Sequence, residues 1–300
     1  METELGAVRL PDGTVLERIA VDGPDAAWKP RFLSLFGHKA PVYLGHVRYA
    51  LDGPLEGLST CFAVGCVAGV PVTAAMVAGA HGAGILGHVY TVPDWRRRGA
   101  ASALFRALMP LCAARGYRVL TLGTNPDGHA RHLYETFGFS ALTPTDGSML
   151  WGDGTPPSGA PDVGPLRWSD WGWVSAAACA PRADGEPLPR SRCLRVGGPG
   201  HVEGAFIAAR SDGLPLVVLR RGAAAVGWAG RTGGGELDLY VRPGQENLAP
   251  LLVAGLNLAP GERLLCVADG YRGRALESAG LRPAGPGAWV GRGAAGTAGS

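Results

Sequence analysis

Lysine, and charge in general, is scarce in this sequence of 300 residues. Only two lysines are present, charged residues make up 18% of the chain, and the formal net charge is +3. Proteins that bind nucleic acid carry a basic tract or a strongly basic face, and the sequence contains no such tract. We therefore expect no nucleic-acid partner.

Long apolar runs are also missing. No run approaches the ~20 residues that a membrane-spanning helix needs, and the N-terminal segment METELGAVRL lacks the basic and apolar regions of a signal peptide. We expect a cytoplasmic protein with no membrane partner. The 48 glycines and 24 prolines, with arginine in place of lysine, are typical of a GC-rich bacterial genome, so we expect a protein of bacterial type.

Paired cysteines are absent as well. The six cysteines are scattered, without the Cys-x-x-Cys or histidine spacing that is typical of zinc sites. They are Cys61, Cys66, Cys112, Cys179, Cys193 and Cys266. We expect reduced, mostly buried thiols and no metal site.

The length and the distribution of glycine and proline predict two domains. Three hundred residues exceed the usual size of one domain, and 46% hydrophobic residues are enough for two cores. Glycine, proline, serine and aspartate dominate residues 153–162, which is typical of a linker. We expect a first domain at residues 1–152 and a second at residues 163–300.

The most informative stretch is residues 84–139. An apolar run over residues 85–92 stops at Pro93, and a basic turn with a glycine, residues 96–101, leads into a helical pattern over residues 103–114. The first N–H groups of a helix have no intrahelical acceptor, and the helix dipole adds positive charge there. Such a turn favours a phosphate group, and its arginines add attraction for the same anion.

This stretch resembles the GNAT superfamily of acetyl-CoA-dependent N-acetyltransferases. Arg96, Gly99 and Ala101 meet the family fingerprint Gln/Arg-x-x-Gly-x-Gly/Ala, and the segment ARHLYETFGF at residues 130–139 matches in order and spacing. The resemblance implies an α+β fold with a mixed α/β sheet. It also implies that acetyl-CoA is the cosubstrate and that a primary amine is the acceptor.

The resemblance further implies roles for individual residues. Backbone N–H groups of residues 97–101 would hold the pyrophosphate, and the N–H near Val92 would face the thioester oxygen. Tyr134 would donate a proton to the departing thiolate, the alternative being a tyrosine that only packs on the last helix. The residues implied in acetyl-CoA binding are Val92, Arg96, Arg97, Arg98, Gly99, Ala100, Ala101 and Asn125.

The general base is less well defined by the sequence. Family members often use a glutamate on the central strands, but neither residues 72–78 nor residues 85–92 contain a carboxylate. His88 is the best candidate because an imidazole titrates near neutral pH, and a buried histidine without a catalytic role is the alternative. His81 and Asp94 are weaker candidates. By analogy alone, His38, Lys39 and His46 lie near the acceptor.

The second half of the chain repeats the order of the first, which predicts a tandem pair of GNAT-like folds. Residues 236–243 correspond to the strand that ends at Pro93. Counting from the two prolines, Glu246 replaces Arg96 and Ala249 replaces Gly99, and Leu276 takes the place of Tyr134. A carboxylate repels phosphate, so we expect a degenerate second half that supports the first.

The sequence thus predicts an acetyl-CoA-dependent N-acetyltransferase that acts on a small-molecule or peptide amine. One alternative is a non-catalytic acyl-CoA sensor or scaffold protein. Another is a tandem transferase resembling mycothiol synthase, which the intact fingerprint in the first half disfavours. The two fused copies predict a monomer.

Overall fold

The computed structural model describes residues 1–23, 25–53, 55–142, 147–178, 216–231, 237–257, 263–265, 270–285 and 288–291. Within these residues the chain divides into two compact units. The first unit takes residues 1–154 and 167–178, and the second takes residues 155–166 and those from 216 onward. No helix in the described part of the chain is long and apolar enough to cross a membrane.

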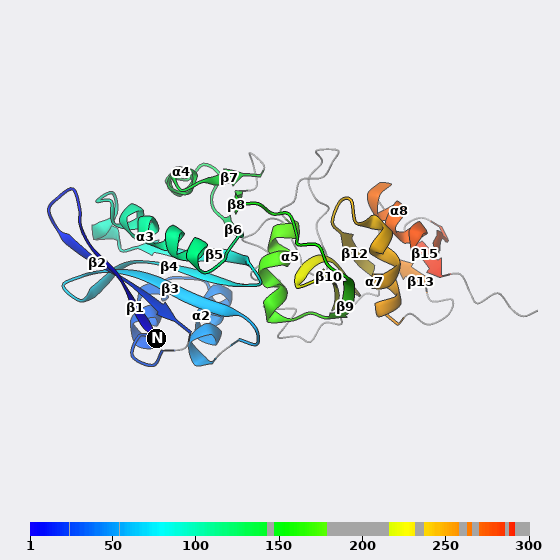
Figure 1. The fold of residues 1–300 in the computed structure, drawn as a ribbon, viewed down its shortest axis with the longest axis horizontal. Helices are drawn as coiled ribbons and strands as arrows, with labels where there is room; N and C mark the ends of the chain where they lie inside the picture. The colour runs from blue at the N-terminus through cyan, green and yellow to red at the C-terminus, as the bar shows by residue number, and fades with distance from the viewer. Residues whose placement is uncertain are drawn as a thin grey trace, which may run out of the picture. The chain divides into compact units, whose positions relative to one another are not determined.

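A mixed eight-stranded sheet forms the centre of the first unit (Figure 1). All of its strand pairs are antiparallel except β5 with β6, which is parallel. The order across the sheet is β1 (Glu2–Arg9), β2 (Val15–Asp22), β3 (Ser59–Val67), β4 (Val70–Ala80), β5 (Ala83–Thr91), β6 (Val119–Gly123), β8 (Ser148–Gly152) and β7 (Phe139–Ala141). The expected mixed α/β fold is therefore confirmed for this unit.

Helices cover both faces of this sheet because successive side chains of the central strands are buried on opposite sides. On one face, α1 (Lys29–Phe36) and α2 (Pro41–Asp52) lie over β3, with the ring of Phe32 stacked 4.4 Å from that of Phe62. On the other face, α3 (Ala100–Ala114) and α4 (His129–Thr136) cover a core that contains Ala63 and Phe105.

Helix α5 (Trp171–Ala178) belongs to the first unit, although the sequence places it in the expected second domain. Its tryptophans Trp171 and Trp173 are fully buried, and the indole Nε1 of Trp173 donates to the carbonyl of His81 at 3.1 Å. The expected boundaries therefore differ from those of the structure in two respects. The first unit extends beyond residue 152, and a strand begins at Pro161 inside the expected linker.

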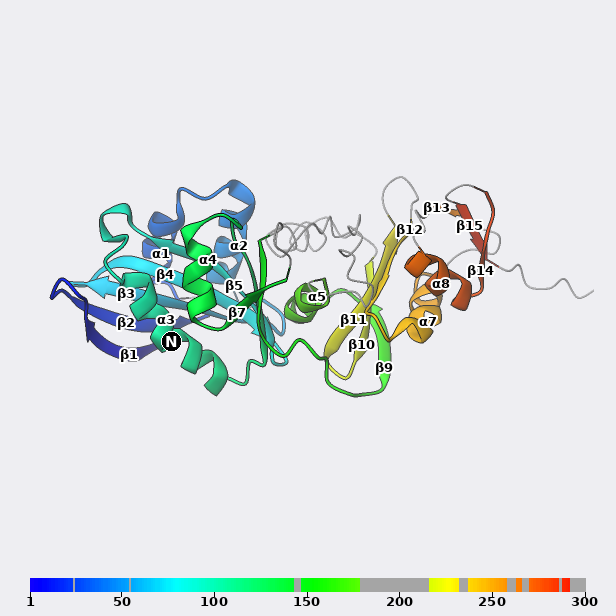
Figure 2. The same cartoon turned by 90° about the horizontal axis from the view of Figure 1, so that it is seen from above.

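The described part of the second unit contains two small antiparallel sheets and two helices (Figure 2). The strands β13, β15 and β14 are arranged in the same order as β6, β8 and β7 of the first unit. Along the chain the elements are β9 (Pro161–Pro165), β10 (Leu216–Arg221), β11 (Ala224–Arg231), β12 (Leu237–Val241), α7 (Ala249–Gly255), β13 (Arg263–Leu265), α8 (Gly270–Ser278), β14 (Leu281–Pro283) and β15 (Ala288–Gly291).

Because of its buried thiols, we expect the first unit to lose stability at alkaline pH. Burial raises the pKa of Cys61 and Cys112 from 9.0 to about 12, and that of Cys66 to about 11. The folded state therefore keeps protons that the unfolded chain releases above pH ~9. We expect the free energy of unfolding to fall by about 1 kcal/mol per buried thiol between about pH 8 and about pH 10.

Denaturant unfolding of the whole chain at several pH values measures this loss. Replacing Cys112 by alanine removes one of the three thiols and should make the pH dependence shallower. A free energy of unfolding that stays constant up to about pH 11 would show that these thiols are not buried as described. The other three cysteines lie outside the described residues.

Candidate functional site

The turn between β5 and α3 has the geometry of an anion cradle. A 3-10 turn, Pro93–Trp95, follows the strand, and then Arg97 and Gly99 adopt positive φ values of 60° and 85°. Gly99 is the N-cap of α3, and its carbonyl accepts the N–H of Ala103 at 2.9 Å. The N–H groups of the first helical turn precede any intrahelical acceptor, so they are directed outward toward a ligand.

Gly99 also leaves space beside this turn. A Cβ atom built there would meet only the ring of Pro11, at 3.5 Å, which is an ordinary contact. The positive φ is what favours glycine at this position, since other residues rarely adopt it. A bulky anion can therefore approach the backbone on this side.

The three predicted arginines hold different positions around the turn. Arg96 donates from Nε to the carbonyl of Thr91 at 3.0 Å, and its guanidinium lies 5.7 Å from the ring of Tyr90. The guanidinium of Arg98 lies 3.5 Å from the carboxylate of Asp12. All three side chains are exposed, so they place positive charge at the surface beside the helix N-terminus.

In the strand that leads into this turn, β5 separates from its parallel neighbour β6. Their pairing in the described structure runs from Ala83 with Val119 to Ile85 with Thr121, and β5 then continues alone on that side to Thr91. A bulge lies within this free stretch, where one residue of β4 faces both His88 and Val89. An extended ligand could therefore pair with this open edge of β5.

The backbone groups of Val92 itself are bonded within the chain. The N–H of Val92 donates to the carbonyl of Val72 at 2.9 Å, and its carbonyl accepts the N–H of Trp95 at 2.9 Å. Both groups are thus occupied by the chain itself, because β5 continues to pair with β4 up to this point. The N–H of Val92 does not face a ligand.

Tyr134 on α4 is 6% exposed and belongs to the core between α3 and the sheet. Its ring centre lies 5.8 Å from that of Phe105 and 6.1 Å from that of Phe139. Burial raises the pKa of the phenol from 10.0 to about 12. The hydroxyl therefore keeps its proton at physiological pH, as a proton donor must.

His88 lies on the opposite face of the sheet from Tyr134. It is 6% exposed, has a positive φ of 52° at the bulge, and its ring lies 5.7 Å from that of Phe36 on α1. The structure therefore places the two predicted catalytic residues on different faces of the sheet. The other predicted contact, Asn125, uses its side-chain oxygen to accept the N–H of Asp127 at 3.1 Å.

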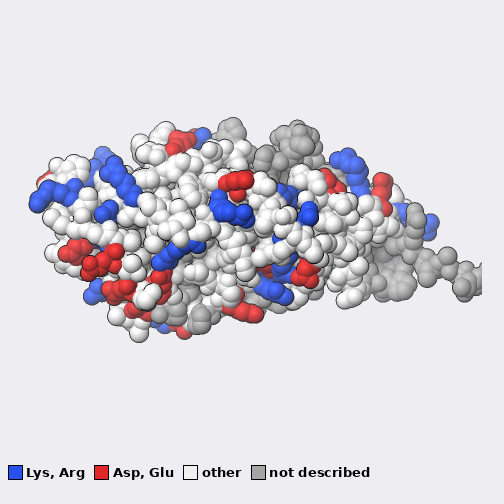
Figure 3. Space-filling model, viewed as in Figure 1, with Lys and Arg blue, Asp and Glu red and all other residues white. Residues whose placement is uncertain are grey.

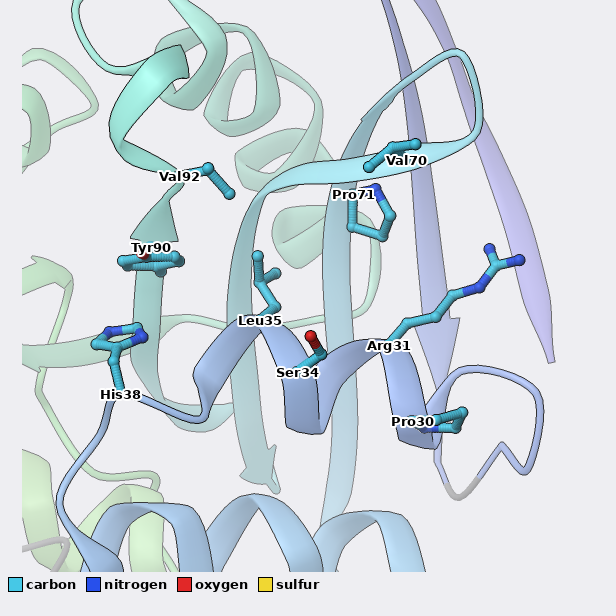
Figure 4. Close-up of a pocket in the computed structure, with 9 residues that line it drawn as sticks. All are labelled: Pro30, Arg31, Ser34, Leu35, His38, Val70, Pro71, Tyr90 and Val92. Carbon is cyan, nitrogen blue, oxygen red and sulfur yellow. The ribbon is translucent and has the colours of Figure 1, made fainter.

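A pocket of about 600 Å³ lies on the α1 face of the sheet, next to the end of β5 (Figure 4). Its walls come from α1 and the residues after it, from the β3–β4 hairpin and from β5. The lining residues are Pro30, Arg31, Ser34, Leu35, His38, Val70, Pro71, Tyr90 and Val92. The rings of His38 and Tyr90 lie 4.0 Å apart at one end of it.

Sequence reasoning named His38 only by analogy and did not identify Arg31, Ser34 or Tyr90. These residues occupy two segments about fifty positions apart, and only the packing of α1 on the sheet brings them together. The helical spacing of Arg31 and Ser34 was the available signal, since residues three apart share a helix face, and His38 follows just after the helix ends. The side chain of His46 lies outside the described residues.

The corresponding turn of the second unit lacks the features of the cradle. Glu246 begins a 3-10 turn, and α7 follows with Ala249 and Pro250 as its first residues. Leu276, at the position of Tyr134, is fully buried. Glu246 therefore lies in the turn of a strand-turn-helix junction, and the correspondence of this junction to the cradle stays a prediction.

Charge elsewhere does not point to a second kind of site. On the face shown in Figure 3, most of the surface is uncharged, and acidic side chains gather at the lower left with basic ones above them. Among the described residues, no group of three or more histidine, cysteine, aspartate or glutamate side chains could hold a metal ion. The cradle and the adjoining pocket are the strongest candidate site in the described structure.

Comparison with protein families identifies the domain that carries this site. Residues 36–139 match the model of the acetyltransferase (GNAT) family, which covers roughly a third of the chain. This segment contains β5, the cradle, α3 and Tyr134, and it forms a GNAT acetyltransferase domain. No curated protein matches the sequence.

Solved structures that resemble the chain are acetyltransferases of low identity. One is the PaiA N-acetyltransferase from Thermoplasma acidophilum in complex with coenzyme A, with 12% identity over 45% of this chain and 99% of that one, and a TM-score of 0.35. Another is the ribosomal-protein-S18-alanine N-acetyltransferase from Escherichia coli, with 18% identity over 44% and 90%, and a TM-score of 0.35. A third is the GNAT domain of S. lividans PAT, with 14% identity over 49% and 94%, and a TM-score of 0.39.

Proposed function

We propose that the first unit is an acetyl-CoA-dependent N-acetyltransferase that acts on a primary amine. The observation that carries this proposal is the cradle at Gly99, joined directly to the open edge of β5 within the segment that matches the family. Exposed N–H groups, a helix N-terminus and three arginines suit a pyrophosphate. The free strand edge suits the amide groups of a pantetheine arm.

In this function acetyl-CoA supplies an activated acyl group, and the chain supplies positioning and proton transfer. The amine nitrogen forms a bond to the acyl carbon while the carbon–sulfur bond breaks. The ammonium of the acceptor first gives one proton to solvent or to a general base, and the neutral amine then attacks. The nitrogen loses a second proton as the amide forms, and the leaving sulfur takes up one, so that one proton is released overall. Tyr134 is the proposed donor to that sulfur, since burial keeps its hydroxyl protonated.

We propose that the second unit is a degenerate copy of the same fold, without an acyl-CoA site. The shared strand order, β6-β8-β7 and β13-β15-β14, supports a common architecture. Glu246 in the turn and a helix of only seven residues after it disfavour phosphate binding.

Replacing Tyr134 by phenylalanine tests the proposed donor. We expect kcat to fall by about 100-fold or more, since general acid catalysis contributes that much or more. The affinity for acetyl-CoA should stay within about twofold of the original value, because the ring keeps its packing. The measurement is release of the CoA thiol with a panel of primary amines.

The matched control is Tyr117→Phe, because Tyr117 packs against the same core. This change should leave kcat nearly unchanged. Equal turnover by the Tyr134 variant and the unmodified protein would show that Tyr134 is only a core residue. Acetyl-CoA binding without turnover of any amine would favour the sensor or scaffold function instead.

A further inference from the structure

The pocket beside the cradle has a composition that selects among amines. None of its nine lining residues is acidic, and the group includes one arginine and one histidine. A pocket for a polyamine, an aminoglycoside or a lysine-rich peptide needs carboxylates to pair with the additional positive charges. The lining of this pocket instead carries positive charge, on Arg31.

Arg31 forms one end of the pocket, and His38 with Tyr90 forms the other (Figure 4). The guanidinium of Arg31 lies 4.9 Å from the centre of the Trp28 ring. Within the described part of the chain, no ion pair is found between Arg31 and a carboxylate. A guanidinium binds a carboxylate or a phosphate in a bidentate manner, so Arg31 is the candidate partner for an anion at this end.

The carboxylates of Glu2 and Glu17 lie near Arg31 and affect the net charge at its end of the pocket. Glu2 accepts a hydrogen bond from Nε1 of Trp28 at 2.6 Å, and Glu2, Glu17 and Arg31 all influence the pKa of Cys66. Neither glutamate lines the pocket. Arg31 is therefore the one residue with a permanent charge among the nine that line the pocket.

The other end of the pocket adjoins the cradle through Tyr90. The Tyr90 ring contacts His38 at 4.0 Å on the pocket side, and the guanidinium of Arg96 lies 5.7 Å from the same ring. Arg96 belongs to the turn proposed to bind acetyl-CoA. An amine at the His38 end is therefore the part of an acceptor nearest to that turn, and an imidazole there can take up its proton.

We propose that the acceptor is an amine that also carries a carboxylate or a phosphate, with Arg31 binding the anion and the amine lying at the end formed by His38 and Tyr90. This inference rests on the proposed acetyltransferase function. Ser34, whose side chain is directed into the pocket between the two ends, supplies a hydroxyl for the middle of such a molecule (Figure 4).

The test compares probes that share an amine on a five-methylene chain and differ in the group at the other end. They are 6-aminohexanoate, 6-aminohexanamide and 5-aminopentyl phosphate, each added to the full-length chain with saturating acetyl-CoA. Binding is measured by ligand-observed NMR, and turnover is measured in parallel by release of the CoA thiol. We expect an anionic probe to bind at least tenfold more tightly than the amide, and the better of the two anions identifies the group.

Arg31→Gln should reduce that preference to about twofold or less, while Arg106→Gln should leave it unchanged. Arg106 is an exposed arginine of α3 that does not line the pocket. Arg31→Glu should reverse the preference toward a diamine such as cadaverine. The preference compares probes on the same variant, so a general loss of folding would weaken binding of all probes equally and leave the ratio unchanged.

The outcomes separate this inference from the function on which it rests. Turnover with no preference for an anionic amine, or a preference unaffected by Arg31→Gln, overturns the inference and leaves the acetyltransferase function intact. Preferential binding of an anionic probe that depends on Arg31, but without turnover, supports the pocket assignment and contradicts the enzyme. No binding of either anionic probe overturns the inference.

Discussion

Replacing Trp173 by alanine should destabilise the protein by about 3–5 kcal/mol, the usual cost of removing a fully buried tryptophan. The ring of Trp173 is completely buried in the first unit, and its Nε1 donates to the carbonyl of His81. The neighbouring Gly172 packs so closely on β5 that a Cβ atom there would lie 2.3 Å from the carbonyl oxygen of Ala83. Helix α5 is therefore a part of the first unit.

Denaturant unfolding of the full chain measures this effect. Trp173→Phe is the matched control, because it keeps most of the buried area and removes the hydrogen bond, and it should cost about 1–2 kcal/mol. A loss below about 1 kcal/mol for the alanine variant would contradict the position of α5 in the structure. The first unit would then be complete without residues 167–178.

Replacing Gly99 by glutamate should weaken acetyl-CoA binding by about 100-fold. A carboxylate ~4 Å from a phosphate oxygen costs about 4 kcal/mol at an effective dielectric constant of ~20. Screening at this exposed turn reduces that value to about 3 kcal/mol, which corresponds to about 100-fold in the dissociation constant. Calorimetric titration of acetyl-CoA measures it.

Gly116→Glu is the matched control for this variant. Gly116 has a φ of 79°, close to the 85° of Gly99, and it has open space beside it at the opposite end of α3. Both variants therefore carry the same charge and a similar backbone strain, about 25 Å apart along the helix. If the two variants lose affinity equally, strain in α3 is the cause and the cradle is not the phosphate site.

The cradle could be predicted from the sequence because its parts are local. Pro93, Gly99 and the helical pattern after them lie within one short stretch, and each residue acts through its own backbone conformation. The equivalent turn of the second half was readable for the same reason. Glu246 and the short helix after it are consecutive elements of one segment.

Features that depend on packing could not be read in this way. The fully apolar helix WGWVSAAA has no exposed face, so its pattern shows burial without showing which sheet buries it. The N–H near Val92 was predicted to face a ligand, but the N–H of Val92 itself donates to the carbonyl of Val72. That strand pairing is not encoded in any local pattern of the sequence. The pocket joins α1 to β5, and only the tertiary fold brings Arg31 and Tyr90 to opposite ends of one cavity.

The central claim is that the first unit binds acetyl-CoA at the junction of β5 and α3. Amide hydrogen exchange of the full chain, with and without acetyl-CoA, tests it most directly because it reports on each segment of the backbone. We expect slower exchange at residues 97–104 and along residues 86–91, and no change at residues 242–256. Protection confined to residues 242–256, or no protection anywhere, would contradict the account.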